Sequence, residues 1–304
     1  MQNSHTVIQM VRKLTVGFIG QGFIGKNYAD DFERRGYEPV RYARSEPYNK
    51  NKEAIGECDI VFIAVPTPTT ERGFDDSVVR EVMALVGDGK IAVIKSTVLP
   101  GTTESIQKQY PNKVILHSPE FLAEATASHN ASNPDRNIVG VPVRNEKCEV
   151  AAKQVLSVLP EAPFNLVCLS RESEIVKYAG NALLYLKVVF ANILYDLSER
   201  EGGDWQVIQG AIAADPRIGG SHLRVKHSSG HEGAREGRGA GGHCFIKDFA
   251  ALRALYAERF PEDTKGLNVL RALECKNNDL LGASGKDLDL LRGVYGEHTE
   301  SPCN

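Results

Sequence analysis

Seven short runs of apolar, largely β-branched residues alternate with helix-length segments along the first part of this 304-residue chain. Most runs are apolar at successive positions rather than at every second one, which indicates strands that are buried on both faces. Strands of that kind occur in parallel sheets that helices cover on both sides. The sequence therefore predicts a doubly wound, mostly parallel sheet with strands at residues 14–20, 39–44, 59–66, 90–97, 113–118, 136–142 and 164–170.

After the last predicted strand the pattern becomes helical. Apolar residues at helical spacing run over residues 172–200, where Gly180 is the one strong helix breaker. We expect an α/β domain over residues 1–170 and a mainly α-helical domain over residues 171–304, built on this long central helix. Shorter helical patterns follow at residues 205–213, 244–260 and 266–283.

The segment GQGFIG joins the first predicted strand to the helix-length segment after it. Gly20, Gly22 and Gly25 stand in GxGxxG spacing, with Phe23 and Ile24 between the last two. Such glycines permit a tight turn and bring the pyrophosphate of a dinucleotide close to a helix N-terminus. The strand before and the helix after are the context that this motif requires, so we predict a Rossmann-like site for NAD or NADP. The alternative is a glycine turn that holds no ligand.

The second predicted strand ends in YARSEP, where an NAD-binding fold usually carries an acidic residue that accepts hydrogen bonds from the ribose. Arg44 and Ser45 occupy this place instead. A guanidinium cannot accept those bonds but can hold a 2′-phosphate, which favours NADP. The alternative is that Arg44 is a surface residue and that Glu46 accepts the ribose hydroxyls.

The stretch GRGAGGHCFIKD places one cysteine directly after a run of glycines. If Cys244 opens a helix, the unpaired N–H groups and the helix dipole there favour a thiolate. Lys247 and Asp248 would lie on the same helix face as the cysteine. A thiolate forms covalent adducts with carbonyl carbons, so we predict a nucleophile. The alternative is a buried structural thiol.

Other polar residues stand in spacings that would bring them together, although each alone has an ordinary structural explanation. Lys177 and Asn181 are four residues apart on the long predicted helix, and Glu120 and Glu124 would share a face if their segment were helical. Thr97 ends a predicted strand.

In this order, the motifs resemble those of the UDP-glucose/GDP-mannose dehydrogenase family, from about residue 14 to about residue 282. The resemblance implies a twofold oxidation of a sugar alcohol to an acid, through a thiohemiacetal and then a thioester on the cysteine. The motifs that carry it are GFIGQGFIG, AVPTPT, KSTVLPGT, SPEFLAEA, NPDRNIVG, EIVKYAGNALL, DPRIGG and GAGGHCFIKD.

The resemblance also implies roles for single residues. Cys244 matches the nucleophile, Lys177 matches the residue that stabilises the oxyanion, and Asp248 matches a carboxylate that organises water. Thr97, Glu120 and Glu124 match residues that hold the catalytic water and the acyl intermediate. Cofactor contacts are implied for Pro66, Thr67 and Thr97. Substrate contacts are implied for Phe121, Leu122, Glu124, Lys177, Asn181, Arg217, Gly241 and Lys247.

The chain departs from the family pattern in two places. A third domain that grips the nucleotide normally follows the central helix, and the chain reaches residue 304 without it, so a smaller sugar or sugar phosphate is one alternative substrate. The loop at residues 219–243 is long and rich in His, Arg and Gly. It either binds substrate phosphates or is a mobile glycine loop; a zinc site is not expected. Ala240 replaces an aromatic residue that often precedes the glycine pair.

The composition excludes several other classes. A net charge of −3 gives no overall reason to expect nucleic acid or a membrane as partner, and the N-terminus lacks the apolar core of a signal peptide. Six scattered cysteines predict free thiols in the cytoplasm, with no metal site. The resemblance implies a homodimer through helix 172–200. Two other functions stay open: a two-electron 3-hydroxyacid dehydrogenase on a smaller substrate, and a non-catalytic cofactor-binding remnant.

Overall fold

The computed structural model describes residues 13–231 and 233–296. All seven predicted strands are present, each a little shorter than its apolar run. Among the described residues a small antiparallel hairpin, β4 with β5, is an addition that the sequence did not predict. The strands are β1 Val16–Ile19, β2 Val40–Tyr42, β3 Ile60–Ile63, β4 Thr69–Thr70, β5 Gly73–Phe74, β6 Ile91–Ile94, β7 Val114–His117, β8 Arg136–Val141 and β9 Phe164–Leu169.

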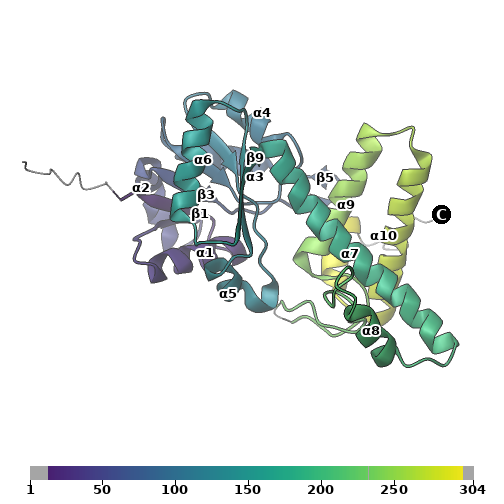
Figure 1. Ribbon diagram of the computed structural model, residues 1–304. Helices are drawn as coiled ribbons and strands as arrows, with labels where there is room; N and C mark the ends of the chain where they lie inside the picture. The colour runs from purple at the N-terminus through teal and green to yellow at the C-terminus, as the bar shows by residue number, and fades with distance from the viewer. Residues whose placement is uncertain (1–12, 232, 297–304) are drawn as a thin grey trace, which may run out of the picture.

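Helices alternate with the strands and then make up the second half of the chain (Figure 1). The predicted long helix is present as α7, which begins two residues earlier than expected. The helices are α1 Phe23–Arg34, α2 Lys52–Glu57, α3 Ser77–Val82, α4 Thr102–Gln109, α5 Ala127–Ser132, α6 Glu146–Val158, α7 Ser170–Arg200, α8 Trp205–Ala213, α9 Gly242–Arg259, α10 Thr264–Ser284 and α11 Leu288–Tyr295, with 3₁₀ turns η1 Tyr48–Asn51, η2 Met83–Leu85 and η3 Glu124–Thr126.

The main sheet has the strand order β2-β1-β3-β6-β7-β8-β9, and every neighbouring pair is parallel except β7 with β8. The buried residues form one apolar cluster with α1, α5 and α6 on one face of the sheet and a second with α2, α3 and α4 on the other. Burial on both faces explains why the strands read as continuous apolar runs. The prediction of a doubly wound, mostly parallel sheet is confirmed.

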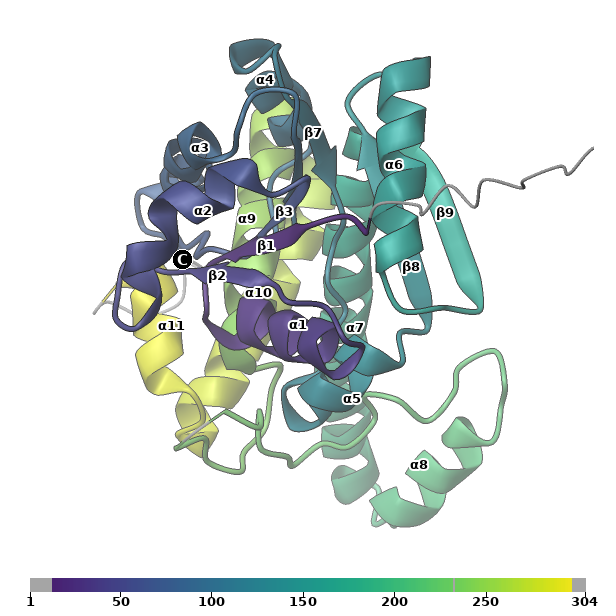
Figure 2. The same cartoon turned by 90° about the vertical axis from the view of Figure 1, so that its left-hand side faces the viewer.

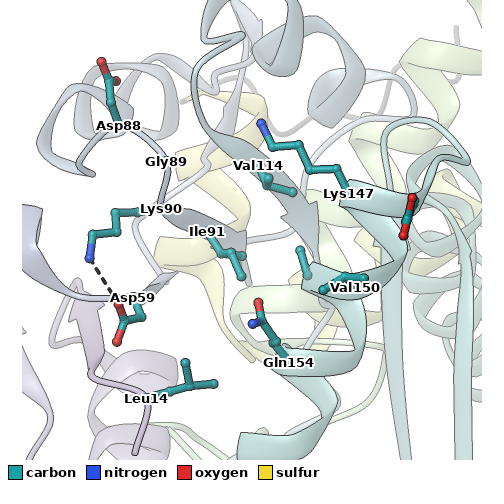
Figure 3. A pocket seen from close by; sticks show the side chains of 12 residues that line it. Leu14, Asp59, Asp88, Gly89, Lys90, Ile91, Val114, Lys147, Val150 and Gln154 are labelled. Carbon is teal, nitrogen blue, oxygen red and sulfur yellow. Dashed lines mark hydrogen bonds and ion pairs between the residues drawn. The ribbon is translucent and has the colours of Figure 1, made fainter. Parts of the chain in front are cut away.

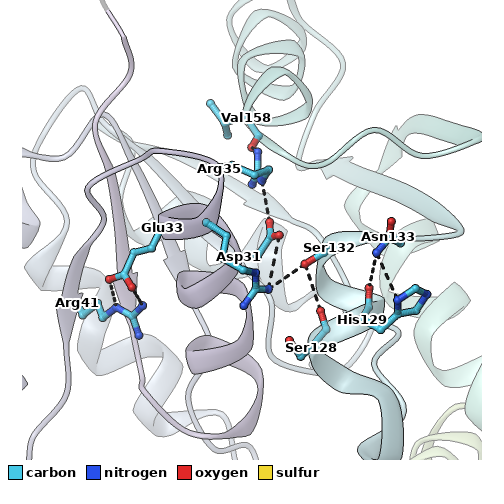
Figure 4. A network of polar contacts seen from close by, with 10 residues as sticks. Asp31, Glu33, Arg35, Arg41, Ser128, His129, Ser132, Asn133 and Val158 are labelled. Atoms are coloured by element: carbon cyan, nitrogen blue, oxygen red, sulfur yellow. Dashed lines mark hydrogen bonds and ion pairs between the residues drawn. The ribbon is translucent and has the colours of Figure 1, made fainter.

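A polar network holds α1 in place against its neighbours (Figure 4). Asp31 is buried on α1 and pairs with Arg35 at 2.8 Å, while the Arg35 guanidinium donates to the carbonyl of Val158 at the end of α6. Arg34 donates to Ser132 on α5 at 2.9 Å. A buried carboxylate is stabilised when it is paired and hydrogen-bonded, so these contacts fix the direction of the helix that follows the glycine turn.

Helix α7 leaves the sheet directly after β9 and runs beside α9 and α10 as a long rod (Figures 1 and 2). Its inner face packs Tyr185, Val188 and Val189 against Phe249 of α9, and the rings of Tyr185 and Phe249 stack at 4.0 Å. This packing holds α9, and with it Cys244, beside the first half of α7. Among the described helices, none has both the length and the apolar character needed to cross a bilayer.

The prediction of free thiols holds for part of the cysteine set. Cys58, Cys148, Cys168 and Cys244 are free. The prediction is wrong for Cys275, which is disulfide-bonded.

Candidate active site

The predicted cofactor residues follow the carboxyl ends of four neighbouring strands, β2, β1, β3 and β6, and therefore gather at one edge of the sheet. Thr67 and Thr97 are buried there, whereas Pro66 is exposed. This is the edge at which dinucleotides bind in open α/β sheets. The residues placed here are Gly20, Gly22, Phe23, Ile24, Gly25, Arg44, Ser45, Pro66, Thr67 and Thr97.

Two glycines of the turn, Gly20 and Gly25, stand where a larger residue would clash with nearby backbone. Gly20 has a φ of 93°, and a Cβ on it would lie 2.1 Å from the carbonyl oxygen of Ala64. A Cβ on Gly25 would lie 1.9 Å from the carbonyl oxygen of Gly20, so α1 packs directly on the turn. Gly22 is the N-cap of α1, faces open space and leaves the helix without a side-chain cap. The free N–H groups at this helix start therefore fit a pyrophosphate.

Arg44 lies at the surface beyond β2, where its guanidinium pairs with Glu81 of α3 at 2.6 Å. Ser45 is exposed beside it. Glu46, the alternative ribose acceptor, lies 3.8 Å from Lys50.

A pocket of about 460 Å³ lies between the segment after β7, the first half of α7, the start of α9 and the loop before α9. A cysteine thiol, a lysine ammonium and an asparagine amide therefore share one cavity, the size of a small-molecule site. Predicted residues that line it are Phe121, Leu122, Glu124, Lys177, Asn181, Gly241 and Cys244.

Lys177 and Glu120 form a buried ion pair at one wall of the pocket. The Lys177 Nζ lies 2.6 Å from Glu120 Oε1 and donates to the Glu120 carbonyl oxygen at 2.9 Å. Burial would lower the pKa of Lys177, but the charge of Glu120 above all, with those of Asp248 and of Cys244 where its thiol ionises, outweighs burial and raises that pKa above its usual value. Lys177 is therefore a fixed ammonium group at neutral pH.

Glu120 and Glu124 would share a face only in a helix, and the segment from residue 118 to residue 123 is not one. Glu120 lies in irregular chain after Pro119, and its Oε2 accepts from the Leu122 N–H at 2.7 Å. Glu124 opens the 3₁₀ turn η3 and lines the pocket, and burial raises the pKa of its carboxyl.

Asn181 and Asp248 connect α7 to α9. The Asn181 amide donates to Asp248 Oδ2 at 2.6 Å, and the other Asp248 oxygen pairs with Lys247. Asp248 is buried behind the pocket wall, so it orients Asn181 from behind. Lys247 is not among the pocket-lining residues, so the structure does not bring it to the predicted sugar contact.

Cys244 is the third residue of α9 and faces the pocket, but its thiol does not have the low pKa that the sequence predicted. Burial raises the pKa of the Cys244 thiol to about 11, with Lys177 acting to lower it and Asp248 and Glu120 acting to raise it. The desolvation cost of a buried thiolate outweighs the favourable helix start. The resting sulfur is a thiol at neutral pH.

The raised pKa gives a pH dependence that can be measured. Because only the thiolate reacts, we expect the rate of Cys244 alkylation by iodoacetamide to rise about tenfold per pH unit from about pH 7 to about pH 10. Peptide mapping by mass spectrometry assigns the label to Cys244. A rate that levels off below about pH 8 would show a thiolate already favoured in the resting protein.

Two predicted residues lie away from the pocket. Thr97 is buried three residues beyond β6 and does not line the cavity. Arg217 is exposed and pairs with Asp215 at 2.6 Å. Substrate contact by Arg217 stays a prediction that would require a second subunit.

Arg136, part of the NPDRNIVG motif, is a pocket residue that was not predicted from the sequence. Its guanidinium lies 3.9 Å from the centroid of the Phe121 ring, and both residues line the pocket. His222, Arg224 and His227 of the long loop line the same cavity. Lys177 is paired with Glu120 and Arg224 lies 3.4 Å from Glu236. Among the described residues, Arg136 is therefore the cation of this wall without an ion-paired carboxylate and the one best placed to meet an anionic group.

A second hollow, of about 590 Å³, lies near the amino ends of β1, β3 and β6, at the opposite edge of the sheet from the cofactor residues (Figure 3). It contains the ion pair of Lys90 with Asp59 at 3.1 Å. It contains none of the predicted site residues. The predicted catalytic residues therefore lie around the other pocket, with Cys244, and not around this hollow.

Comparison with known protein families supports the same assignment. Residues 38–159 match the NAD binding domain of the UDP-glucose/GDP-mannose dehydrogenase family. Residues 171–278 match the central domain of that family.

Proteins with similar sequences include UDP-glucose 6-dehydrogenases. The chain is 32% identical over 214 residues to one of Rhizobium meliloti, and the alignment covers 66% of this chain and 46% of the relative. It is 30% identical over 271 residues to a UDP-glucose 6-dehydrogenase of Rickettsia typhi, covering 86% of this chain and 58% of the relative. The chain thus spans about half the length of these relatives.

Solved structures show the same architecture. A UDP-glucose dehydrogenase from the archaeon Pyrobaculum islandicum superposes with a TM-score of 0.73 at 26% identity, over 89% of this chain and 70% of that chain. A 3-hydroxyisobutyrate dehydrogenase of Mycobacterium tuberculosis superposes with a TM-score of 0.62 at 15% identity, over 88% of this chain and 96% of that chain. The second likeness shows a shared fold alone.

Proposed function

Because the chain belongs to the UDP-glucose/GDP-mannose dehydrogenase family, we propose that it oxidises the primary alcohol of a sugar or nucleotide sugar to a carboxylate with NAD(P). The observation that supports this most is the cavity in which the Cys244 thiol, the Lys177 ammonium and the Asn181 amide meet. The cofactor, when bound, supplies the hydride acceptor for both oxidations. A simple two-electron alcohol oxidation needs no cysteine at this place.

Each side chain of the pocket has a separate proposed role in the reaction. The first oxidation would turn the alcohol into an aldehyde. The Cys244 sulfur then adds to the aldehyde carbon, the thiol proton passes to water, and the electron pair of the C=O bond moves to the oxygen, which becomes an oxyanion. The Lys177 ammonium stabilises that charge, and Glu120 holds the ammonium in position at 2.6 Å. Asn181, oriented by Asp248, donates to the same region. The second oxidation leaves a thioester on Cys244, which water hydrolyses to the acid.

The carboxylates of Glu120 and Glu124 are proposed to serve the hydrolytic step, whereas Thr97, which does not line the cavity, is proposed to act on the cofactor side. Glu124 lines the cavity, and burial raises the pKa of its carboxyl, which makes that carboxylate a better proton acceptor than an exposed one. Phe121, Leu122 and Gly241 form pocket wall against the substrate. Arg136, Arg224 and the histidines of the long loop are proposed to face its anionic part.

We propose further that the cofactor site, formed within residues 1–170, accepts NADP more readily than NAD. Arg44 and Ser45 lie just beyond β2, where an acidic ribose ligand would stand, and Glu46 lies beside Lys50 instead. The Arg44 guanidinium is at the surface and would exchange its exposed pair with Glu81 for the 2′-phosphate. The expected result is a higher kcat/KM with NADP than with NAD, measured by cofactor reduction at saturating sugar. A clear preference for NAD would contradict this proposal.

We propose that the active protein is a homodimer formed through α7. Residues 171–304 would then be both the dimerisation domain and the catalytic domain. The cytoplasm is its proposed location. The outer face of α7 carries a row of exposed apolar side chains at helical spacing, which typically marks a protein interface. The row comprises Ile175, Leu183, Leu186, Phe190, Ile193 and Leu197.

The experiment that tests the function is a turnover screen with UDP-sugars, GDP-sugars and simple sugar phosphates, each with NAD and NADP. The proposal predicts two reduced cofactors for each acid formed. One reduced cofactor for each product would instead support a two-electron dehydrogenase. Cofactor binding without turnover of any sugar would support a non-catalytic remnant.

A further inference from the structure

The short corner between α10 and α11 carries a buried carboxylate that the function described so far does not use. Gly285 ends α10 in a left-handed conformation, and Asp287 follows with a φ of 53° and an almost fully buried side chain. An aspartate with positive φ is uncommon and is worth a structural explanation. Asp287 also lies beyond residues 171–278, which match the family.

Asp287 accepts hydrogen bonds from two different segments that border the active-site pocket. Its Oδ2 accepts from the backbone N–H of Gly242, the first residue of α9, at 2.7 Å, and from the hydroxyl of Ser229. Its Oδ1 lies 3.0 Å from Nε2 of His231. One carboxylate therefore joins the start of the Cys244 helix to the loop that covers the pocket.

The fit around this carboxylate is close. A Cβ on Gly241 would lie 2.0 Å from Asp287 Oδ2, so the chain before α9 can pass only because residue 241 is a glycine. Burial would raise the pKa of Asp287, but the Ser229 hydroxyl, the Gly242 N–H, His231 and Lys286 together hold it below its usual value. Asp287 therefore carries a negative charge that three donors satisfy.

The neighbouring lysine extends the same connection. Lys286 is fully buried, and its Nζ donates to the carbonyl oxygen of Gly239 at 2.9 Å and lies 3.0 Å from Nε2 of His227. His227 and Ser229 line the pocket. Two adjacent residues of the corner thus hold both the glycine run before Cys244 and the loop opposite it.

We propose that Asp287 is a positioning residue of the active site, which sets where α9 begins and holds the loop over the same pocket. The idea rests on the proposed function, because it gives the Cys244 sulfur its required place. Gly242 is two residues from Cys244, so a shift of the helix start moves the sulfur directly. Misplacement of a reacting group by about 1 Å can cost about 100-fold in rate.

The test compares Asp287→Asn with Asp263→Asn. The amide oxygen of asparagine can accept only part of these hydrogen bonds, and its NH₂ group then faces the remaining donors. The carboxylate's simultaneous contacts with Gly242, Ser229 and His231 are therefore lost. Asp263 is the matched control because it also caps a helix, accepting from the Gly266 N–H at 3.0 Å and from the Tyr256 hydroxyl at 2.6 Å, but it does not line the pocket. Both variants lose a helix cap. Asp287 contacts the first residue of α9, beside Cys244, whereas Asp263 contacts Tyr256 near the opposite end of that helix.

For Asp287→Asn we expect kcat to fall about tenfold or more, because a sulfur displaced by part of an ångström reacts more slowly. We also expect the alkylation rate of Cys244 at fixed pH to change by about threefold or more. Asp263→Asn should leave both within about twofold. Wild-type kcat and alkylation in Asp287→Asn, or an equal loss in Asp263→Asn, would overturn the proposal. The alkylation measurement needs no substrate. It therefore tests the role of Asp287 even if no sugar in the screen is turned over.

A milder variant covers the case in which Asp287→Asn does not fold. His231→Ala removes one donor to the carboxylate from the loop and leaves the Gly242 contact in place. It should raise KM several-fold while the alkylation rate of Cys244 stays near that of the wild type. An unchanged KM would overturn the part of the proposal that concerns the loop.

Discussion

Cys244→Ala should abolish formation of the acid, with kcat reduced by at least about 10³-fold, the scale of loss seen when a catalytic nucleophile is removed. The physical reason is that alanine offers no atom that can hold the acyl group between the two oxidations. The measurement is acid formed from a substrate found in the turnover screen, quantified by chromatography together with reduced cofactor.

Cys168→Ala is the matched control for this variant. Cys168 is a second free thiol, buried where Cys244 is half-buried, and burial likewise raises its pKa to about 11, but it lies on β9 outside the pocket. Its replacement should leave turnover unchanged apart from a modest loss of stability. Undiminished turnover in Cys244→Ala would favour a two-electron hydroxyacid dehydrogenase, in which no cysteine is needed.

Lys177→Met should reduce both activity and stability. Loss of the ammonium removes the group proposed to stabilise the oxyanion, which we expect to lower kcat by about 10²-fold or more. It also leaves Glu120 as a buried carboxylate without its cation, and breaking a buried pair in this way costs about 3–5 kcal/mol of unfolding free energy. Because the buried Lys95 also interacts favourably with Glu120, we expect the lower end of that range.

The double variant Lys177→Met with Glu120→Gln separates the two effects. It removes the unpaired charge, so we expect most of the unfolding free energy to return in urea denaturation while kcat stays low. Recovery of activity along with stability would show that Lys177 acts through folding alone. A single variant with normal kcat would contradict its role at the oxyanion.

The parts of the fold that the sequence predicted are those set by local pattern. The strands are continuous apolar runs because helices cover both faces, and the glycine spacing reflects contacts at Gly20 and Gly25 with backbone close by. The β4–β5 hairpin has only two residues in each strand, too few to produce an apolar pattern. Glu120 and Glu124 have helical spacing, but residues 118–123 form no helix, because the Glu120 side chain instead accepts from the Leu122 N–H.

The parts that the sequence could not predict depend on burial and on distant contacts. The raised pKa of Cys244 follows from desolvation, which only the packed structure reveals. Asp287 meets Gly242 and Ser229 across 45 and 58 residues of chain, with no local motif to mark it. The chemistry-bearing residues were recognisable because they cluster in short motifs, whereas their supporting contacts do not.

The central claim is that the Cys244 sulfur carries the substrate as a covalent adduct. The most direct measurement is mass spectrometry of the intact protein and of its peptides after acid quenching during turnover. The account predicts an added mass equal to the acyl form of the sugar, on the peptide that contains Cys244 and absent from Cys244→Ala. Steady turnover to the acid with an unmodified Cys244 peptide at every quench time would contradict it.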